Sequence, residues 1–127
     1  EIRLGDLTPT RDLLFVKDTA RAFVAIAESD SLIGEDCNIA TGEEISVGDL
    51  AQKLISKIRP QSRIVSDEQR LRPEKSEVFR LLGSCEKLMA HTDWKKPRSL
   101  DEGLAETIAW FSDPVNRAGY KSNIYNL

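Results

Sequence analysis

Short apolar runs and helical stripes divide the first third of the chain. A continuous apolar run over residues 13–16 is bounded by charged residues, which predicts a buried strand or an extended segment packed on both sides. Asp18 is the expected N-cap of the helix that follows, about three turns long. Its inward face is predicted from apolar residues spaced i, i+3, i+4 and i+7, namely Ala20, Phe23, Val24 and Ala27.

A second helix is predicted between two boundary signals. Ser46 is a good N-cap with Asp49 three residues later, a variant of the capping box, and Pro60 stops the helix. Ahead of it, residues 37–40 predict a short strand, and residues 41–44 have the polar and glycine content of a turn. The inward face combines six apolar positions at helical spacing: Val47, Leu50, Ala51, Leu54, Ile55 and Ile58.

A charged stretch separates this helix from the C-terminal part. Residues 63–66 predict an edge strand, and residues 67–80 predict a surface loop, because Pro73 forbids regular backbone bonding there. Loops of this kind often carry ligands. Ser84 is the expected cap of a short helix whose inner side holds Cys85, Leu88 and Met89.

The last long helix is predicted from Ser99, with Glu102 in the capping-box position, to Pro114. The elements therefore run strand, helix, strand, helix, strand, loop, helix, helix. This order predicts an α/β fold that is small and helix-rich, and too small for a complete doubly wound sheet.

Composition narrows the class of protein. The chain has 127 residues, 40% hydrophobic and 31% charged, and a formal charge of −3. This length and composition are typical of one globular domain. The slightly negative net charge gives no positive field that would attract nucleic acid or an anionic membrane. Without an apolar run long enough to span a bilayer, the chain is expected to be cytoplasmic. Cys37, Cys85 and the single histidine, His91, lack metal-site spacing, so no metal is expected and the thiols are predicted to be buried and reduced.

Four segments, in this order and spacing, carry a family resemblance. They are Leu4-Gly5 followed by Arg-Asp-Leu-Leu-Phe-Val-Lys-Asp over 11–18, Asn-Ile-Ala-Thr-Gly over 38–42, Arg-Pro-Glu-Lys-Ser-Glu-Val over 72–78, and Trp-x-x-Pro-x-Ser-Leu-x-Glu-Gly-Leu over 94–104. Together they resemble the C-terminal part of the extended short-chain dehydrogenase/reductase family, the NAD-dependent nucleotide-sugar epimerases and 4,6-dehydratases. The tail over residues 120–125 is similar to that of dehydratases that act on nucleotide-linked N-acetylglucosamine in the legionaminic-acid pathway.

The resemblance implies that cofactor binding and substrate binding belong to different parts of the parent protein. In this family an N-terminal Rossmann domain binds NAD(P) through a glycine-rich turn, and a Tyr-x-x-x-Lys pair acts in catalysis. Neither pattern occurs among the 127 residues. Residues 1–127 are therefore expected to form one C-terminal sugar-nucleotide-binding domain with no catalytic or cofactor-binding residue. The chain starts at Glu1, and we expect a longer parent enzyme that holds the NAD(P).

The expected site residues suit a sugar nucleotide. A diphosphate needs permanently charged, multi-donor partners, and the planar fork of arginine supplies them. By resemblance, Arg11 and Arg72 approach the diphosphate or nucleoside, and Glu77 accepts hydrogen bonds from the ribose or base. Without the resemblance, Arg11 would be read as half of an ion pair at a sheet margin and Arg72 as a solvated loop charge. Arg70 is a further candidate that the family pattern does not single out.

Other conspicuous residues are expected to be structural. We assign His91 to a cap or the surface, Trp94 and Trp110 to packing of the last helix, and Asn38 to a strand end. Asp12 is read as a strand-end partner.

The expected partners are a nucleotide sugar linked to UDP, GDP or CDP, the Rossmann domain and, as a homodimer, a second copy of the chain. The parent is expected to be a nucleotide-sugar 4,6-dehydratase, and a nucleotide-sugar epimerase is the alternative. The chain could also be a free-standing binding module or an inert fragment that keeps the fold.

Overall fold

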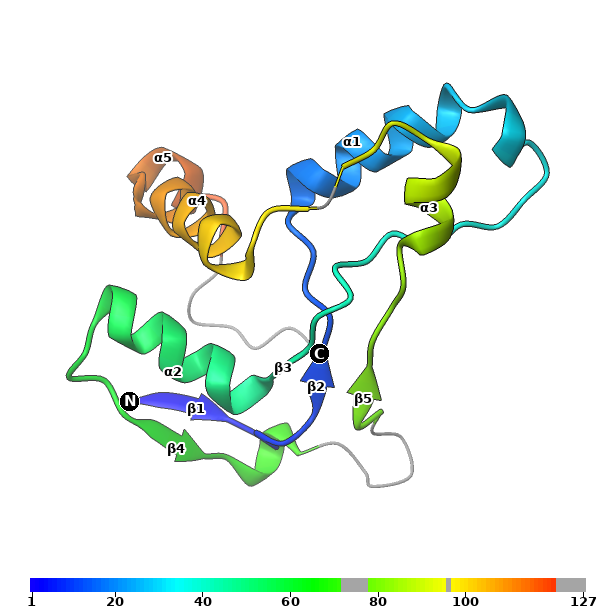
Figure 1. The fold of residues 1–127 in the computed structure, drawn as a ribbon. Coiled ribbons are helices and arrows are strands. Elements are labelled where there is room, and N and C mark those ends of the chain that lie inside the picture. The colour runs from blue at the N-terminus through cyan, green and yellow to red at the C-terminus, as the bar shows by residue number, and fades with distance from the viewer. Residues whose placement is uncertain (72–77, 96, 121–127) are drawn as a thin grey trace.

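The described residues form two small sheets with helices around them (Figure 1). The computed structural model describes residues 1–71, 78–95 and 97–120. Strand β1 (Ile2–Leu4) pairs in parallel with β4 (Ile64–Ser66), which confirms the strand predicted over 63–66. In the other sheet, β2 (Thr10–Arg11) lies between the antiparallel β3 (Ile45–Ser46) and the parallel β5 (Arg80–Leu81).

Of the two alternatives predicted for residues 13–16, a strand or an extended segment, the strand is wrong. The paired residues are Thr10 and Arg11, because β3 and β5 flank the chain only there. Residues 12–15 follow without regular structure, and α1 (Val16–Ala27) begins at Val16 instead of at Asp18. Asp18 is therefore not a cap, and it lies in the first turn of the helix, fully buried.

The inward face predicted for this helix is also wrong. Ala22 is fully buried, whereas Phe23 is 64% and Val24 57% exposed. Ala22 belongs to the core cluster with Cys85, Leu88 and Trp94, and Ala25 and Ile26 pack against it. Small alanines thus face the core, and the larger apolar residues face outward.

Residues 37–40 do not form the predicted strand. Cys37 and Ile39 pack against the core cluster, and Asn38 is exposed. Within the described residues, no backbone hydrogen bond joins this segment to another strand. The alternation typical of a strand is present, but a neighbouring strand is not.

Helix α2 (Val47–Ile58) confirms the second predicted helix. The Ser46 side chain accepts a hydrogen bond from the backbone N–H of Asp49 at 3.0 Å, as expected of an N-cap. Ile55 is buried, but Ile58, in the last turn, is 61% exposed. After β4, the 3-10 helix η2 (Glu68–Arg70) interrupts the predicted loop.

Helix α3 (Glu86–His91) and helix α4 (Leu100–Ser112) occupy the predicted places. The N-cap of α3 is Cys85, one residue beyond the predicted Ser84, and Met89 is exposed instead of inward. The capping box of Ser99 and Glu102 is confirmed. Pro114 ends the long helix and also opens a short one, α5 (Pro114–Arg117).

The two tryptophans differ in burial. Trp94 is 5% exposed and donates its indole N–H to the carbonyl of Asp18. It is a packing residue, but it packs in the core cluster with Ala22 and Leu88 instead of against the last helix as predicted. Trp110 is 45% exposed and makes edge-on contacts with the rings of Phe111 and Tyr120, so it is no core anchor.

The predicted small, helix-rich α/β fold is confirmed. Figure 1 shows α1 and α3 at one end of the molecule and β1, β4 and α2 at the other. None of the helices in the described part of the chain is long and apolar enough to cross a membrane.

Candidate functional site

Arg11 lies on the central strand of the three-stranded sheet. On both sides of it along the chain, backbone bonds join β2 to β5: Thr10 donates to Phe79 at 2.8 Å and Asp12 donates to Leu81 at 2.9 Å. Arg11 is half-buried, and its Nη1 donates to the carbonyl of Thr10 at 2.7 Å. The strand thus holds the backbone of Arg11 in a fixed place.

Asp12 fastens this strand to the turn that follows residues 37–40. Its carboxylate accepts hydrogen bonds from the backbone N–H of Thr41 and of Gly42, both at 2.9 Å, and from the Thr41 hydroxyl at 2.6 Å. Gly42 has a φ of 76°, a conformation that favours glycine. Asp12 is therefore more than the strand-end partner that we predicted, because it joins segments about thirty residues apart.

A second carboxylate, Glu44 directly before β3, links the strands of the same sheet. Glu44 accepts a hydrogen bond from the Thr10 hydroxyl at 2.6 Å and forms an ion pair with Arg80 at 2.7 Å. The Arg80 guanidinium, followed by the Thr10 hydroxyl, holds the pKa of the Glu44 carboxyl below its ordinary value. All three strands are thereby linked through side chains around Arg11.

The described residues on both sides of residues 72–77, the segment of the other two predicted site residues, are anchored to the rest of the fold. Arg72 and Glu77 lie outside the described residues. Before the loop, Asp67 donates its backbone N–H to Leu4 at 2.8 Å, and a Cβ added at Gly5 would overlap the carbonyl oxygen of Arg70. After it, Phe79 bonds to Thr10. The structure therefore brings both ends of the loop to the chain segment 4–11, which leads into the strand of Arg11.

Arg70 is the further candidate in η2. It is half-buried, and its Nε lies 3.2 Å from a carboxylate oxygen of Asp67 in the same turn. Asp67 also caps η2 by accepting the backbone N–H of Gln69. The placement gives Arg70 a structural role at the entrance to the loop.

Sequence reasoning missed an apolar surface beside the loop. Leu71 and Val78, the residues that flank it, are each 48% exposed, and Phe79 is 53% exposed. Exposed aromatic and aliphatic side chains offer stacking area of the kind that a nucleotide base uses. The apolar pair Val78 and Phe79, set within a charged stretch, was the available signal.

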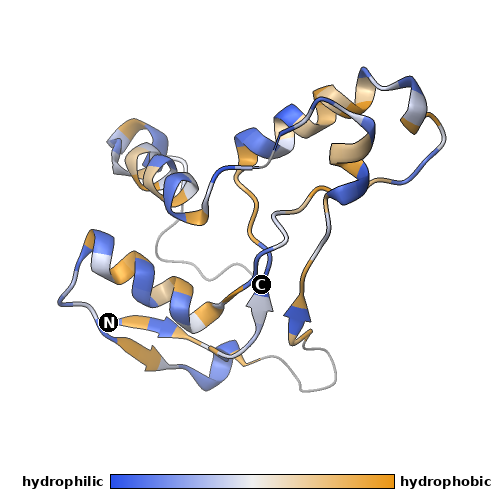
Figure 2. Cartoon of the chain, viewed as in Figure 1, coloured by the Kyte–Doolittle hydropathy of each residue, from blue (hydrophilic) through white to orange (hydrophobic). Residues whose placement is uncertain are grey.

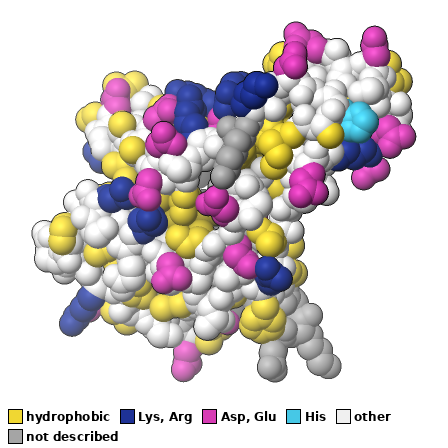
Figure 3. Space-filling view, in the orientation of Figure 1, with side chains coloured by type: hydrophobic (Ala, Val, Ile, Leu, Met, Phe, Trp, Pro, Cys, Tyr) yellow, Lys and Arg dark blue, Asp and Glu magenta, His cyan; other side chains and the backbone are white. Residues whose placement is uncertain are grey.

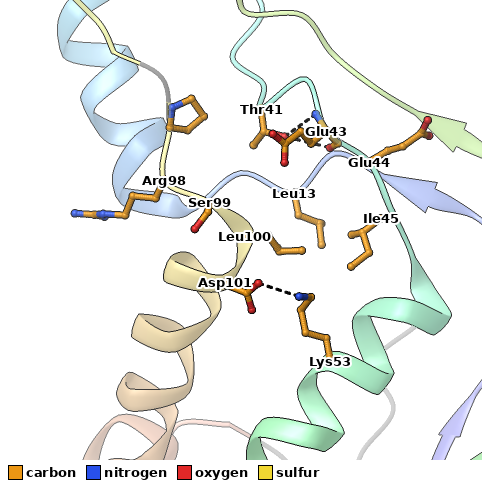
Figure 4. A pocket seen from close by; sticks show the side chains of 11 residues that line it. Leu13, Thr41, Glu43, Glu44, Ile45, Lys53, Arg98, Ser99, Leu100 and Asp101 are labelled. Atoms are coloured by element: carbon orange, nitrogen blue, oxygen red, sulfur yellow. Dashed lines mark hydrogen bonds and ion pairs between the residues drawn. The ribbon is translucent and has the colours of Figure 1, made fainter.

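A cavity between α2 and the start of α4 is a separate feature (Figure 4). Its volume is about 350 Å³ and its charged lining includes Lys53, Arg98 and Asp101. Lys53 and Lys57 pair with Asp101 at 2.9 and 3.0 Å and hold the pKa of its carboxyl below the ordinary value. The Arg98 guanidinium points away from the hollow. Arg11 is not in the lining, but Thr41 and Glu44 are, so the cavity adjoins the sheet that carries Arg11.

Apolar side chains surround the same region. A neighbouring hollow of about 350 Å³ is lined mainly by apolar side chains, including Leu14, Leu50 and Leu104. Figure 3 shows hydrophobic side chains at the surface between the lobes of α2 and α4. This hollow lies between apolar side chains of α2 and α4, and it has few polar groups that could orient a ligand.

Asp18 forms a buried polar node at the junction of α1 and α4. Its carboxylate accepts a hydrogen bond from the backbone N–H of Arg98 at 2.9 Å and forms an ion pair with the Arg21 guanidinium. Burial raises the pKa of Asp18, but these two partners outweigh it and hold the pKa below its ordinary value. The Arg98 guanidinium also lies over the Phe15 ring, 5.2 Å from its centroid. The node is structural, because it joins α1 to the segment that leads into α4.

Metal chemistry has no support in the part of the chain that is described. There, no three His, Cys, Asp or Glu side chains lie close enough to hold an ion. Cys85 is buried and Cys37 is half-buried, and both are free thiols. His91 is exposed at the end of α3.

The chain is similar to a known enzyme family over most of its length. The family described as GDP-mannose 4,6 dehydratase matches residues 1–107. The GDP-6-deoxy-D-mannose reductase of Pseudomonas aeruginosa is 28% identical over 108 residues, which cover 85% of this chain and 34% of that protein. The chain thus spans about a third of the length of the curated relatives that it matches.

Solved structures give the same relationship. An epimerase of Methanothermobacter thermautotrophicus matches with a TM-score of 0.81 and 28% identity, over 92% of this chain and 35% of that one. The Bordetella bronchiseptica enzyme WbmF, solved in complex with NAD⁺ and UDP, matches with a TM-score of 0.63 and 29% identity, over 88% of this chain and 31% of that one.

Proposed function

Because the chain belongs to the NAD-dependent nucleotide-sugar epimerases and dehydratases of the extended short-chain dehydrogenase/reductase family, we propose that it is their nucleotide-sugar-binding part. One observation supports this most. The described residues on both sides of residues 72–77 are anchored to the segment that leads into the strand of Arg11. That placement suits a site in which the strand and the loop contact one ligand.

The proposed roles follow from side-chain chemistry. Arg11 and Arg72 donate to the diphosphate, and Glu77 accepts hydrogen bonds from ribose hydroxyls or the base. Phe79 and its apolar neighbours offer a surface to the nucleoside. UDP is the reference ligand, since it is bound in the structure of the related WbmF. GDP and CDP remain alternatives, to be compared with it.

The cofactor belongs to the rest of a longer protein in this proposal. The sequence has no Gly-x-x-Gly-x-x-Gly turn to cradle a dinucleotide, and neither Tyr120 nor Tyr125 has a lysine four residues later. The residues of this chain therefore do not fit NAD(P), and we derive no chemical step through it. Residues 1–127 then act as one substrate-binding domain of an NAD(P)-dependent enzyme.

The proposed reaction of the whole protein is 4,6-dehydration of a nucleotide sugar, because the matching family is described by that activity. Epimerisation is the second candidate, favoured by the related epimerase from Methanothermobacter thermautotrophicus. The likeness to the legionaminic-acid dehydratases stays a prediction.

Calorimetric titration of UDP, GDP and CDP into the chain tests the binding proposal. Replacing Arg11 or Arg72 by Ala should weaken the preferred nucleotide by about 1.5 to 3 kcal/mol, the range for hydrogen bonds to charged groups. Arg72→Lys should recover only part, because an ammonium cannot form a bidentate fork. Arg59→Ala, at the exposed end of α2, is the matched control. Unchanged nucleotide affinity in both Arg11→Ala and Arg72→Ala would refute the assignment of these two residues to the binding site.

A further inference from the structure

Arg11 and Thr10 lie on different faces of the three-stranded sheet, because successive side chains of a strand point to opposite sides. The strand register places Ser46 of β3 and Arg80 of β5 directly beside Thr10. We call the side of the sheet made by Thr10, Ser46 and Arg80 the Thr10 face. A group on this face lies behind Arg11, so it can hold the strand in place without contacting a ligand of Arg11.

The proposed nucleoside contact, Phe79, shares the face of Arg11. Phe79 directly precedes Arg80, so the same alternation turns it away from the Thr10 face. Its carbonyl accepts the backbone N–H of Thr10 at 2.8 Å, and the residue is 53% exposed. A shift of β5 relative to β2 would therefore move Phe79 relative to Arg11.

Glu44 joins all three strands on the Thr10 face. Its carboxylate accepts hydrogen bonds from the Thr10 hydroxyl at 2.6 Å and from the Arg80 Nε at 2.9 Å, and the Arg80 Nη2 lies 2.7 Å from it. Two guanidinium nitrogens on one carboxylate form a bidentate pair, which fixes orientation as well as distance. Since Glu44 directly precedes β3, these contacts span the sheet from one edge to the other.

Arg80 is the one charged residue in an apolar stretch. Its neighbours within residues 78–82 are Val, Phe, Leu and Leu (Figure 2). Its side chain is 66% exposed, against 27% for Glu44. The Arg80 guanidinium lowers the pKa of the Glu44 carboxyl, and that carboxyl raises the pKa of Arg80. Each partner therefore stabilises the charged form of the other.

The backbone ladder that this pair crosses is short. Each of β2, β3 and β5 has two residues. Strands of this length are marginal without side-chain contacts, and such regions open locally at low free energy. A bidentate pair across the sheet is therefore expected to slow this opening.

We propose that Glu44 and Arg80 are positioning residues for the nucleotide site. Their ion pair, with the Thr10 hydroxyl, holds β5 against β2 and thereby keeps Phe79 in a fixed place relative to Arg11. Neither residue of the pair contacts the nucleotide. This inference rests on the proposed function, because it explains how the two proposed contacts stay in register. A site that is ordered before the ligand arrives loses less conformational entropy on binding.

UDP titration of the ¹⁵N-labelled chain, followed by amide chemical shifts, tests the proposal. Glu44→Gln and Arg80→Gln should each raise the dissociation constant for UDP about three- to fivefold. The pair can influence binding by no more than it contributes to holding the strands, and an exposed ion pair of good geometry contributes about that ratio. The double variant should bind no more weakly than either single variant, because all three lack the same contact.

Charge reversal and a matched control distinguish this role from general destabilisation. Glu44→Arg combined with Arg80→Glu restores a pair of opposite charges and should recover UDP affinity. Glu35→Gln breaks another exposed long-range pair, with Lys87 at 2.9 Å, and should leave UDP affinity unchanged. The indole N–H signal of Trp94, which donates to Asp18 in the core, should not move in any of these variants.

Hydrogen exchange reports on the strands without a ligand. The amides of Thr10 and Asp12, which donate to Phe79 and Leu81, should exchange about three- to fivefold faster in Glu44→Gln than in the wild type. Additive losses of UDP affinity in the Glu44→Gln/Arg80→Gln variant would overturn the positioning role, and this test does not require the charge-reversed chain to fold. Affinity that stays low in a folded charge-reversed chain would overturn it as well.

Replacement of Arg11 separates the two proposals. If Arg11→Ala weakens UDP binding while Glu44→Gln and Arg80→Gln leave it unchanged, the positioning role is wrong and the binding function stands. If Arg11→Ala leaves UDP affinity unchanged while exchange of the Thr10 and Asp12 amides is faster in Glu44→Gln, the ion pair holds the strands and the binding function fails.

Discussion

Removing the Asp18 carboxylate should destabilise the domain more than any surface substitution. The Asp18 side chain is fully buried, and it accepts the backbone N–H of Arg98 at 2.9 Å together with the Arg21 guanidinium. In Asp18→Ala, the Arg98 N–H loses its partner in a buried place. That loss costs about 1 to 3 kcal/mol for the unsatisfied donor. The Arg21 guanidinium is partly exposed, so water compensates it, whereas the Arg98 Nη1 atom is buried and has no hydrogen-bond partner among the described residues.

The total for Asp18→Ala should be about 2 to 4 kcal/mol in the free energy of unfolding, when the charge-assisted bond is included. Asp18→Asn keeps an acceptor for the Arg98 N–H and should lose roughly half as much. Urea denaturation followed by circular dichroism measures both. Asp93→Asn, an exposed aspartate on the connector before α4, is the control and should stay within about 0.5 kcal/mol of the wild type.

The pH dependence of stability gives an independent check. The folded pKa of Asp18 is held below its ordinary value of 3.8, so its contribution is present above that value and is lost as the pH falls through the folded pKa. The wild-type chain should therefore lose stability more steeply than Asp18→Asn below about pH 4. A loss under 0.5 kcal/mol in Asp18→Ala, or parallel pH profiles for wild type and Asp18→Asn, would refute the role of the node.

Three further outcomes are expected. Gly5→Ala should lower the free energy of unfolding by about 1 to 3 kcal/mol in urea titration, because the new Cβ overlaps the Arg70 carbonyl. Gly119→Ala has open space around the new Cβ and should be neutral, so equal effects of the two substitutions would contradict the close approach at Gly5. Ser99→Ala should cost about 1 kcal/mol in the same assay through loss of the α4 capping box, and an unchanged midpoint would count against it. The purified chain should neither convert nucleotide sugars nor retain NAD(P) in equilibrium dialysis, and any turnover would show that a catalytic site had been overlooked.

Local signals predicted two of the helices well. The Ser46 cap, the apolar spacing and Pro60 placed α2, and the capping box at Ser99 placed α4. These signals act through backbone groups within a few residues, so they do not depend on distant partners. Pro114 was predicted to end the long helix, but it also begins α5, which was not predicted. Proline suits the first turn of a helix, where its missing N–H would have no partner within the helix.

Features that depend on partners could not be predicted from the local pattern. The apolar run over residues 13–16 met no neighbouring strand, while two residues, Thr10 and Arg11, did. On α1 the bulkier residues, Phe23 among them, determined the predicted inward face, but the core accepts small alanines there. A helix with two apolar faces has no unique inward side until its neighbours are known.

The candidate site was predicted in part. The motif of the resemblance contains Arg11, but the strand was predicted after it, over residues 13–16. Nothing local indicated that Glu44 and Arg80 would meet beside Arg11 across 36 residues. The apolar residues flanking the 72–77 loop were hidden within a charged segment. Arg72 and Glu77 stay predictions, because they lie outside the described residues.

Amide chemical-shift mapping of the ¹⁵N-labelled chain during UDP titration tests the central claim most directly. Binding is expected to be weak, on the order of 1 mM, because charge-assisted phosphate contacts act without the rest of the pocket. The largest shifts should fall on the amides of residues 10–12 and 78–81, which border the loop. Shifts confined to the cavity of Lys53 and Asp101, or none at saturating UDP, would contradict the account.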